Sequence, residues 1–430
     1  MRDGQAIVIR GDARNLPLPD KSVDLVCTSP PYFGLRDYRD GDASLAGQIG
    51  NEPTPWEYLE SLWVCTREWM RVLKPEGSLW INLGDKYAQN AERSRNGQGA
   101  RRTTRSGGLT GTPGYLAETT VELGRRDNGV PLKSLIGLPW LYAAGCTGAL
   151  ARVGGHDPHL DLILRAEIVW SKPSAMPESV TDRVRRTHEQ IFHFTKQPQY
   201  YSAVDEIRLP ASDYERKPGA RRTTPPGQRR RAMADTVNPL GALPGSVWEI
   251  ASQPLLVPDH LQADHYAAYP FEIPRRIIRG WSPPGICTAC GEGRRPVSSR
   301  HAEQAPSSIQ GARDRVAATG GAISGGTERS TLRGTATRVV TGYACACRNP
   351  DAPTAPAVVL DPFGGSGTTA LVASVLGRTG ISVDRSADYC RIAAWRTTDP
   401  GERARAMGVP KPEPVHPQQS SLFDEEVSRA

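Results

Sequence analysis

The segment at 358–384, VVLDPFGGSGTTALVASVLGRTGISVD, constrains the fold of this chain most strongly. An apolar run ends at Asp361, a glycine-rich loop follows at 364–367, and residues 368–376 have helical apolar spacing. A second apolar run ends at Asp384. Two buried strands joined through one helix predict a parallel βαβ unit. The glycines allow a ligand to approach the backbone of the loop closely.

Three kinds of ligand use such a loop. A Walker phosphate loop needs Gly-Lys-Ser/Thr, whereas Gly367 is followed by Thr368. A dinucleotide fingerprint fits loosely around Gly365 and Gly367. S-adenosylmethionine also needs a glycine loop with an acidic ribose ligand, and Asp384 is placed for that role. Asp361 is placed near the amino acid moiety of such a cofactor. The unit therefore predicts a nucleoside cofactor, and a loop that serves only as a tight turn is the alternative.

The rest of the chain alternates between strand and helix patterns. Strands are predicted at 6–9, 22–26, 78–83, 164–170, 189–195 and 246–250, and helices at 56–73, 132–150 and 271–279. This alternation predicts an α/β fold, with a mostly parallel twisted sheet flanked by helices. The 43 glycines and 37 prolines among 430 residues indicate long loop insertions.

A second motif, TSPPY, ends the predicted strand at 22–26. Pro30 and Pro31 cannot donate to a sheet ladder, so the backbone leaves the sheet in a stiff, extended conformation. Ser29 and Tyr32 therefore form a polar group and an aromatic ring that are held together at the carboxyl end of a strand.

TSPPY followed much later by LDPFGGSGTT resembles the β group of the DNA amino-methyltransferases, in which the catalytic motif precedes the cofactor motif. The blocks LKPEGSLWINLGDKY, EIVWSKPSAMPESVTDRVRRTHEQIFHFTK and HYAAYPFEIPRRII are also similar to that family and follow its order. The resembling blocks cover roughly half of the chain. The family implies a Rossmann-like fold that binds S-adenosylmethionine and methylates the exocyclic amino group of a flipped base in double-stranded DNA.

The resemblance also implies the site residues. Ser29 Oγ and the Pro30 carbonyl would accept hydrogen bonds from the amino group, while Tyr32 would stack on the flipped base. Asp85 would orient or deprotonate Ser29, or would only cap a loop. The implied catalytic residues are Ser29, Pro30, Pro31, Tyr32 and Asp85, and the implied cofactor-binding residues are Asp12, Asp361, Phe363, Gly365, Gly367, Thr368 and Asp384. Asp12 would contact the adenine amino group of the cofactor, or would cap a turn.

The residue before Pro-Pro-Tyr bears on the base that is modified. Family members with serine there resemble the cytosine-N4 enzymes, and those with aspartate mostly methylate adenine N6, so Ser29 favours cytosine N4. Methylation of cytosine C5 needs a thiolate nucleophile, and its usual Pro-Cys dipeptide is absent from the sequence. Adenine N6, an RNA or small-molecule substrate, and an inactive DNA-binding or regulatory relative remain alternatives. A partner restriction endonuclease also remains open.

Four of the eight cysteines form two tight pairs, Cys287-x-x-Cys290 and Cys345-x-Cys347. Four thiolates brought together by folding suit a structural Zn²⁺ ion. The 54 residues between the pairs are more than the usual spacing, and unconnected reduced cysteines are the alternative.

Charge and composition suggest the partner and the domain organisation. A net charge of +7 and two arginine-rich stretches favour a polyanion such as DNA. No run of 18 apolar residues occurs, so we expect no membrane contact and a cytoplasmic location in a prokaryotic cell or a phage-infected host. The expected segments are a catalytic part (1–90), a flexible basic loop (91–130), the continued methyltransferase domain (131–210), a basic candidate recognition loop (211–245), a further part of that domain (246–280), a zinc-binding insertion (281–350), a cofactor-binding part (351–398) and a disordered tail (399–430).

Overall fold

The computed structural model describes residues 4–34, 39–40, 43–44, 46–88, 126–127, 130–175, 177–209, 240–255, 257–261, 269–301, 337–347, 349 and 351–410. The chain divides into two compact units. The first unit comprises Met1–Tyr201, Ser246–Ile278 and Pro356–Ala430, and the second comprises Ser202–Gly245 and Arg279–Ala355.

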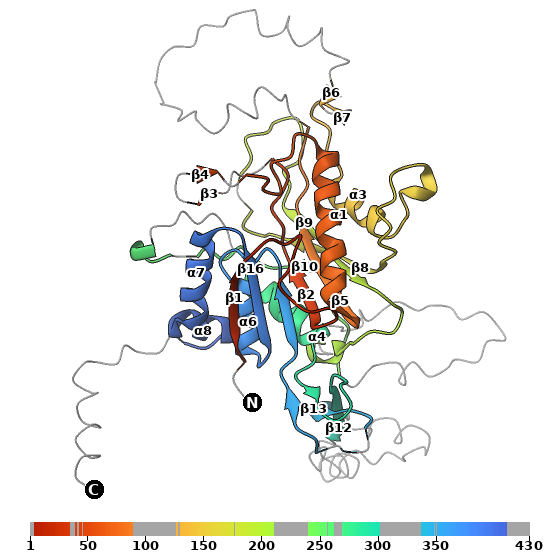
Figure 1. Cartoon of the computed structure of the whole chain (residues 1–430), viewed down its shortest axis with the longest axis vertical. Helices are drawn as coiled ribbons and strands as arrows, with labels where there is room; N and C mark the ends of the chain where they lie inside the picture. Colours follow the sequence, from red (N-terminus) through yellow and green to blue (C-terminus); the bar gives the residue numbers. More distant parts are fainter. Residues whose placement is uncertain are drawn as a thin grey trace, which may run out of the picture. The chain divides into compact units, whose positions relative to one another are not determined.

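An eight-stranded sheet forms the centre of the first unit (Figure 1). Its order is β1 (Ala6–Arg10), β16 (Thr379–Asp384), β15 (Val358–Asp361), β2 (Val23–Thr28), β5 (Leu73–Leu83), β9 (His188–Thr195), β8 (Ile163–Ser171) and β10 (Val247–Glu249). All neighbours pair in parallel except β9, which is antiparallel to both β5 and β8. The mostly parallel sheet that the sequence predicts is therefore confirmed.

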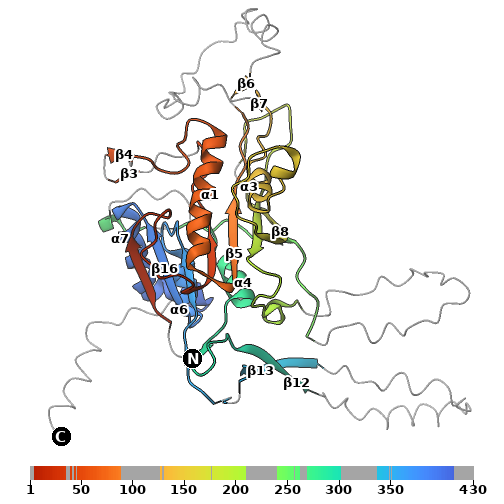
Figure 2. The same cartoon turned by 45° about the vertical axis from the view of Figure 1, so that its right-hand side comes forward.

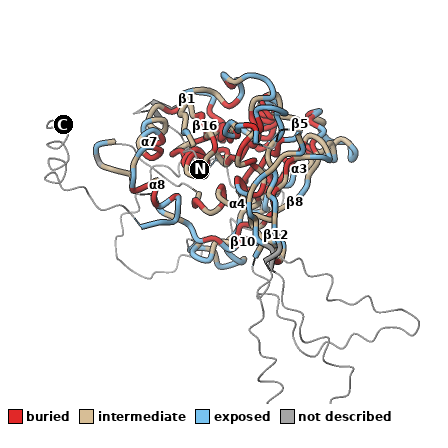
Figure 3. The backbone as a smooth tube through the Cα atoms, turned by 90° about the horizontal axis from the view of Figure 1, so that it is seen from below, coloured by how far each residue is buried: buried red, intermediate tan, exposed pale blue. Residues whose placement is uncertain are grey.

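Apolar runs account for the central strands. Every residue of β2 is buried, and so is most of β5. Strands covered on both faces read as continuous apolar stretches, which is why these segments show little alternation. Figure 3 shows buried backbone concentrated along the strands near β5 and β16.

The helices α1 (Pro55–Val72), α3 (Leu138–Cys146) and α6 (Thr368–Val375) form where the sequence has helical periodicity. α1 starts at a capping box in which Thr54 Oγ1 accepts from the Glu57 N–H and the Glu57 carboxylate accepts from the Thr54 N–H. α1 packs on β5 and on α3, as Figure 2 shows from the side. α6 packs on β15 and β16, which completes the βαβ unit.

Two predicted boundaries are wrong. The helix expected at 132–150 begins only at Leu138, because Gly137 is left-handed with φ 86° and Pro139 lies in the first turn. In the tail expected from 399, residues Pro400–Met407 form helix α8 after helix α7 (Ala387–Thr398). Asp399 caps α8, and the buried Arg396–Glu402 ion pair joins α7 to α8.

The remaining elements are short. In the second unit β12 (Arg295–His301) and β13 (Thr337–Ala344) form an antiparallel pair, and β11 (Ile286–Cys287) pairs with β14 (Thr354–Ala355). The others are β3 (Arg39–Asp40), β4 (Ala43–Ser44), β6 (Arg126–Asp127), β7 (Val130–Pro131), α4 (Glu272–Trp281) and the 3₁₀ turns Ala151–Val153, Val204–Ile207 and Asp259–Leu261. Among the helices of the described ranges, none is both long and apolar enough to span a membrane.

Candidate active site

A cavity of about 930 Å³ opens at the edge where the parallel strands end, within the first unit. Its walls come from the segments that follow β1, β2, β15 and β16, and from Asn82 near the end of β5. Lys172 after β8 and Glu189 at the start of β9 also line the cavity. Both predicted motifs, TSPPY and the glycine loop, therefore line one cavity.

The glycine loop between β15 and α6 lies directly against the sheet. The Gly364 N–H donates to the Val383 carbonyl (2.9 Å), and a Cβ at Gly364 would lie 1.9 Å from Ser382 Oγ. Gly365 and Gly367 are both left-handed, with φ 49° and 76°. Only glycine adopts this close and left-handed path without strain, so the glycine run is a structural requirement of the cavity wall.

Asp384 holds this loop in place. Its Oδ2 accepts from the Gly365 N–H (2.9 Å) and its Oδ1 accepts from the Ser386 N–H (2.9 Å). Burial raises the pKa of this carboxyl group, and the backbone N–H donors oppose that shift. Asp384 lines the cavity together with Phe363, Gly365 and Thr368, so most of the predicted cofactor residues are brought together.

Asp12 lies on the same wall, directly after β1. Its carboxylate accepts from the Arg14 backbone N–H (2.9 Å) and from the Arg14 guanidinium (2.7 and 3.0 Å). These hydrogen bonds lower the pKa of Asp12. Arg385 Nε lies 3.7 Å from the same carboxylate. Both roles expected from the sequence are compatible with this position, since Asp12 caps a turn and also lines the cavity.

Asp361 occupies a different place from the one predicted. It is 1% exposed and does not line the cavity, because its carboxylate faces hydroxyl groups behind the wall. Thr28 and Thr369 each donate a hydroxyl hydrogen bond to it at 2.7 Å. Burial raises the pKa of Asp361 to about 6. Tyr269, which does line the cavity, also donates to this carboxylate (3.4 Å), so Asp361 supports the wall from behind.

Ser29, Pro30, Pro31 and Tyr32 all line the cavity at the end of β2. The Tyr58 hydroxyl donates to the Pro31 carbonyl (2.9 Å), which fixes this turn on α1. The ring of Tyr32 packs against Gly84, where a Cβ would come within 2.6 Å of the ring. The motif is thus held rigidly at its backbone and at its aromatic ring.

Three side chains from other strands and loops, those of Asn82, Glu189 and Lys172, form a hydrogen-bonded group with Ser29 and Tyr32 of the TSPPY motif. The Tyr32 hydroxyl donates to Glu189 Oε2 (2.6 Å). Asn82 Nδ2 donates to the same Glu189 oxygen and to the Tyr32 hydroxyl (both 2.8 Å), and lies 3.4 Å from Ser29 Oγ. Lys172 Nζ forms an ion pair with Glu189 Oε1. Burial, together with the nearby Glu189 charge, raises the pKa of Tyr32 well above its usual value.

Asp85 does not reach Ser29 and is not part of the cavity wall. Its carboxylate accepts from the N–H groups of Gly137 and Leu138 (3.0 Å each) at the start of α3. Arg186 lies 3.5 Å from it. Asp85 therefore caps α3, which was the alternative reading of the sequence, because a carboxylate satisfies the unpaired N–H groups of a helix terminus.

Sequence reasoning missed Asn82, Glu189 and Lys172. Asn82 lies near the carboxyl end of β5 and Lys172 directly after β8, whereas a residue at the start of a strand is not expected at that edge of a parallel sheet. Because β9 runs antiparallel, its first residues lie at that same edge, with Glu189 opposite Trp170 of β8. The sequence signal that could have identified Glu189 is a carboxylate at the start of an apolar strand, in the block EQIFHFT.

The four paired cysteines come together in the second unit. Their sulfur atoms all lie within 4.8 Å of one another, with Cys287–Cys347 at 3.8 Å and Cys345–Cys347 at 3.3 Å. Backbone N–H groups of Cys290 and Ala289 lower the pKa of the Cys287 thiol to about 6. The predicted arrangement of Cys287, Cys290, Cys345 and Cys347 is present.

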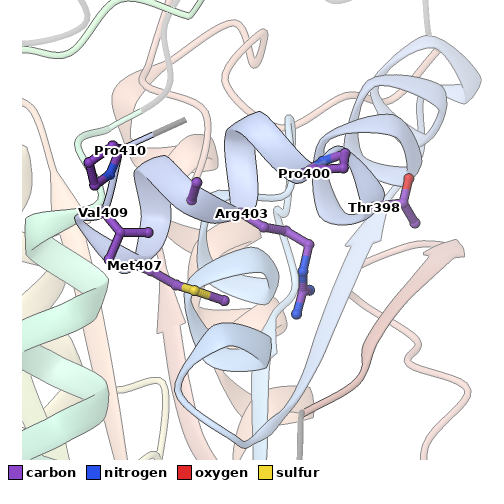
Figure 4. A pocket seen from close by; sticks show the side chains of 7 residues that line it. Thr398, Pro400, Arg403, Met407, Val409 and Pro410 are labelled. Carbon is purple, nitrogen blue, oxygen red and sulfur yellow. The ribbon is translucent and has the colours of Figure 1, made fainter. Parts of the chain in front are cut away.

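The two arginine-rich stretches fall almost wholly on residues 89–125 and 210–239, which lie outside the described ranges. A second hollow of about 470 Å³ lies on α8 and is lined by Thr398, Pro400, Arg403, Ala404, Met407, Val409 and Pro410. Figure 4 shows Met407 and Arg403 projecting from this helix. No predicted site residue lines the hollow, and the Arg403 guanidinium donates to Ser374 Oγ (3.2 Å) and the Thr397 carbonyl (3.3 Å).

The chain is similar in sequence to known DNA methylases. The family model described as DNA methylase matches residues 23–288 and 354–394. The type II methyltransferase M.SmaI of Serratia marcescens is 32% identical over 280 residues, which is 65% of this chain and 76% of that protein. M.Cfr9I of Citrobacter freundii is 32% identical over 289 residues, covering 65% and 74%. Among solved structures, the cytosine-N4-specific PvuII DNA methyltransferase is similar at 15% identity, with a TM-score of 0.48 over 94% of this chain and 91% of that one.

Proposed function

The chain belongs to the DNA methylase family, and from that premise we propose that it transfers a methyl group from S-adenosylmethionine to the N4 amino group of cytosine in double-stranded DNA. One observation carries the proposal. Residues of the TSPPY motif and of the glycine loop line the same cavity. A hydrogen bond from Thr28 to Asp361, which are 333 residues apart in the sequence, joins the two segments. A methyl donor and an acceptor amino group can therefore meet there.

The residues on the glycine-loop side fit the cofactor. S-adenosylmethionine supplies a methyl group on a positively charged sulfur. Asp384 has carboxylate oxygens on the cavity wall that would accept the two ribose hydroxyls, and the glycine loop leaves room for the nucleoside. Phe363 offers an apolar face beside it, and Asp12 a hydrogen-bond acceptor. Asp361 is omitted from this set, because its carboxylate lies behind the wall.

The TSPPY side fits an exocyclic amino group. The lone pair of that nitrogen is delocalised into the base ring, so an enzyme must direct it toward the sulfonium methyl. Ser29 Oγ and the Pro30 carbonyl would accept the two N–H groups, and the stiff prolines fix the direction of the carbonyl. Positioning and electrostatic stabilisation of this kind need no covalent intermediate. Tyr32, held by Gly84 and by its hydroxyl, would present a ring edge or face to the base.

Ser29 supports cytosine N4 over adenine N6, because family members with a serine before Pro-Pro-Tyr resemble the cytosine-N4 enzymes. Adenine N6 is the second candidate, since the exocyclic amino groups of both bases offer the same two N–H donors.

Mass spectrometry of nucleosides from DNA of cells that express the protein tests this proposal. We expect N4-methylcytosine, and its loss in Ser29→Ala, while Ser22→Ala keeps it because Ser22 only bonds the Pro19 carbonyl. N6-methyladenine as the sole product would overturn the base assignment and keep the enzyme class. No methylated base from well-expressed, folded protein would overturn the proposed function.

We also propose that the four cysteines bind one structural Zn²⁺ ion. Zinc–sulfur bonds of about 2.3 Å in a tetrahedron place the sulfurs about 3.8 Å apart, and the sulfur atoms here lie within 4.8 Å of one another. Only Cys287 falls within the family match, while the other three lie in the interval 289–353 that the match leaves out. Such an ion would be specific to this segment and would play no part in methyl transfer.

Metal analysis of protein purified without added zinc checks the ion. About one equivalent is expected in the wild type and in Cys390→Ser, whose sulfur lies outside the cluster. Cys287→Ser should lose it. Folded wild-type protein without metal would rule the site out.

The relatives are type II methyltransferases, which supports a modification role with a partner restriction endonuclease. Plasmid DNA from expressing cells should then resist a restriction endonuclease that cuts the same sequence. Full cleavage by every endonuclease whose site contains the mapped methylated base would contradict that role.

A further inference from the structure

The cavity contains a carboxylate that no assigned role uses. In the described part of the chain, four carboxylates line the cavity, namely those of Asp12, Glu178, Glu189 and Asp384. Of these four carboxylates, only that of Glu189 is hydrogen-bonded to a side chain of the TSPPY motif, through the Tyr32 hydroxyl at 2.6 Å. Its side chain is 14% exposed and its second oxygen pairs with Lys172.

Methyl transfer to an amino group leaves a proton that must be removed. The nitrogen lone pair forms the new N–C bond while the electron pair of the S–C bond stays on sulfur, so the cofactor becomes neutral and the nitrogen becomes positive. Loss of one N–H proton then restores a neutral base. The Ser29 hydroxyl, which would accept an amino N–H, is too weak a base to keep that proton.

The side chains around Ser29 form a path for this proton. Ser29 Oγ lies 3.4 Å from the Tyr32 hydroxyl, and that hydroxyl lies 2.6 Å from Glu189 Oε2. Asn82 Nδ2 contacts all three groups and fixes their relative positions. Because burial keeps the pKa of Tyr32 well above its usual value, its hydroxyl stays protonated between turnovers and can accept one proton as it donates another.

We propose that Glu189 is the proton acceptor of the reaction, reached from Ser29 through the Tyr32 hydroxyl. The proton that leaves the amino group moves to Ser29 Oγ, the serine proton moves to Tyr32, and the tyrosine proton moves to Glu189, which becomes a neutral acid. Lys172 forms an ion pair with the other oxygen of the Glu189 carboxylate. Glu189 therefore acts through Tyr32 and is a positioning, proton-accepting residue. This inference rests on the proposed function.

Single-turnover kinetics test it, with S-adenosylmethionine labelled in the methyl group and bacterial genomic DNA free of amino-methylation. Glu189→Gln keeps an acceptor for Tyr32 but is not basic, and Tyr32→Phe keeps the ring but removes the hydroxyl. Each should slow methyl transfer at least about 100-fold while cofactor affinity stays within about twofold. The double variant should be no slower than the slower single variant, because both changes interrupt one path.

Two matched controls separate this effect from loss of buried groups in general. Tyr142→Phe removes a buried hydroxyl that bonds Thr66, and Glu68→Gln removes a carboxylate that pairs with Arg71. Neither residue lines the cavity, so their transfer rates should match the wild type.

Chemical rescue distinguishes a base from a structural support. Added formate should restore part of the rate of Glu189→Ala and none of the rate of Tyr32→Phe. A Glu189→Gln rate within threefold of wild type, or a slow Glu189→Ala that formate does not rescue, would overturn this inference alone. If Glu189→Gln does not fold, a Tyr32→Phe rate within threefold of wild type overturns it. An inactive wild type would instead overturn the proposed function.

Discussion

Asp361 and Asp384 end neighbouring strands, yet their carboxylates have different surroundings. Asp384 lines the cavity, and its oxygens accept backbone N–H groups of the loop. Asp361 faces the hydroxyls of Thr28 and Thr369 behind the wall. The direction of the side chain therefore decides whether such an aspartate can contact a bound cofactor or only stabilises the cavity wall.

Asp384→Ala should weaken the binding of S-adenosylmethionine by about 1–3 kcal/mol, because the ribose hydroxyls and the Gly365 N–H would lose their acceptor. Isothermal titration calorimetry measures this. Asp388→Ala is a suitable control, since Asp388 pairs with Arg391 on α7 and does not line the cavity. Unchanged affinity in Asp384→Ala would remove the ribose assignment.

Asp361 should make stability depend on pH. Its pKa is about 6 in the folded protein and 3.8 in an unfolded chain, so between these values the unfolded state has already released a proton that the folded state keeps. Stability from this group is thus present below pH 4 and is lost as the pH rises through 6. The amide of Asp361→Asn does not titrate, so the wild type should lose about 2–3 kcal/mol relative to that variant between pH 4 and 7. Urea unfolding at both pH values measures the difference, and a constant difference would contradict the assignment.

At the scale of elements, the site depends on how closely α6 lies on the sheet. Gly380 of β16 faces the backbone of Ala370 in α6, where a Cβ would come within 2.4 Å of the carbonyl oxygen. The same helix carries Thr368 to the cavity wall at its first turn. Packing of α6 therefore sets the position of the glycine loop.

Gly380→Ala should destabilise the protein by about 1–3 kcal/mol, because helix backbone cannot move aside as a flexible side chain would. Gly342→Ala in β13 is the matched control, since a Cβ there meets nothing within 4 Å and its φ is not positive. That variant should stay within about 0.5 kcal/mol of the wild type. Thermal denaturation compares them, and equal losses would show that the contact with α6 does not limit stability.

At the scale of the whole molecule, the candidate active site and the cysteine cluster belong to different units. Every cavity-lining residue belongs to the first unit, whereas all four cysteines belong to the second. A structural ion in the second unit would therefore stabilise that unit without taking part in cofactor binding.

A strong zinc chelator should accordingly increase proteolysis of the segment around the cysteines while leaving the affinity for S-adenosylmethionine within about twofold. Limited proteolysis followed by mass spectrometry locates the cuts, and calorimetry on the treated protein measures the affinity. We expect this increase in proteolysis because the binding of a structural zinc ion is coupled to the folding of the segment that holds it. Loss of cofactor binding on chelation, with the first unit still folded, would contradict this separation.

Elements with strong local signals were predictable from the amino-acid sequence. Continuous apolar runs predicted the buried strands, helical spacing predicted α1 and α6, and the glycine loop predicted the path from β15 to α6. The Ser29–Tyr32 motif and the pairing of cysteines were also local, because two prolines or two nearby thiols restrict the backbone wherever they occur. These features depend on residues close together in the chain, which a sequence displays directly.

The identity of the polar groups that face the cavity depends on long-range packing and was not predictable from local sequence. Glu189 lies beside Tyr32 because β9 runs antiparallel in a parallel sheet, and strand direction follows from pairings between segments more than 100 residues apart. Asp85 was assigned to the site from the family resemblance and Asp361 from its position at a strand end. The N–H groups of α3 and the hydroxyls behind the wall hold these two carboxylates elsewhere. A sequence shows which groups need partners, and folding selects the partners, because a buried carboxylate turns toward the nearest donors that the packed chain provides.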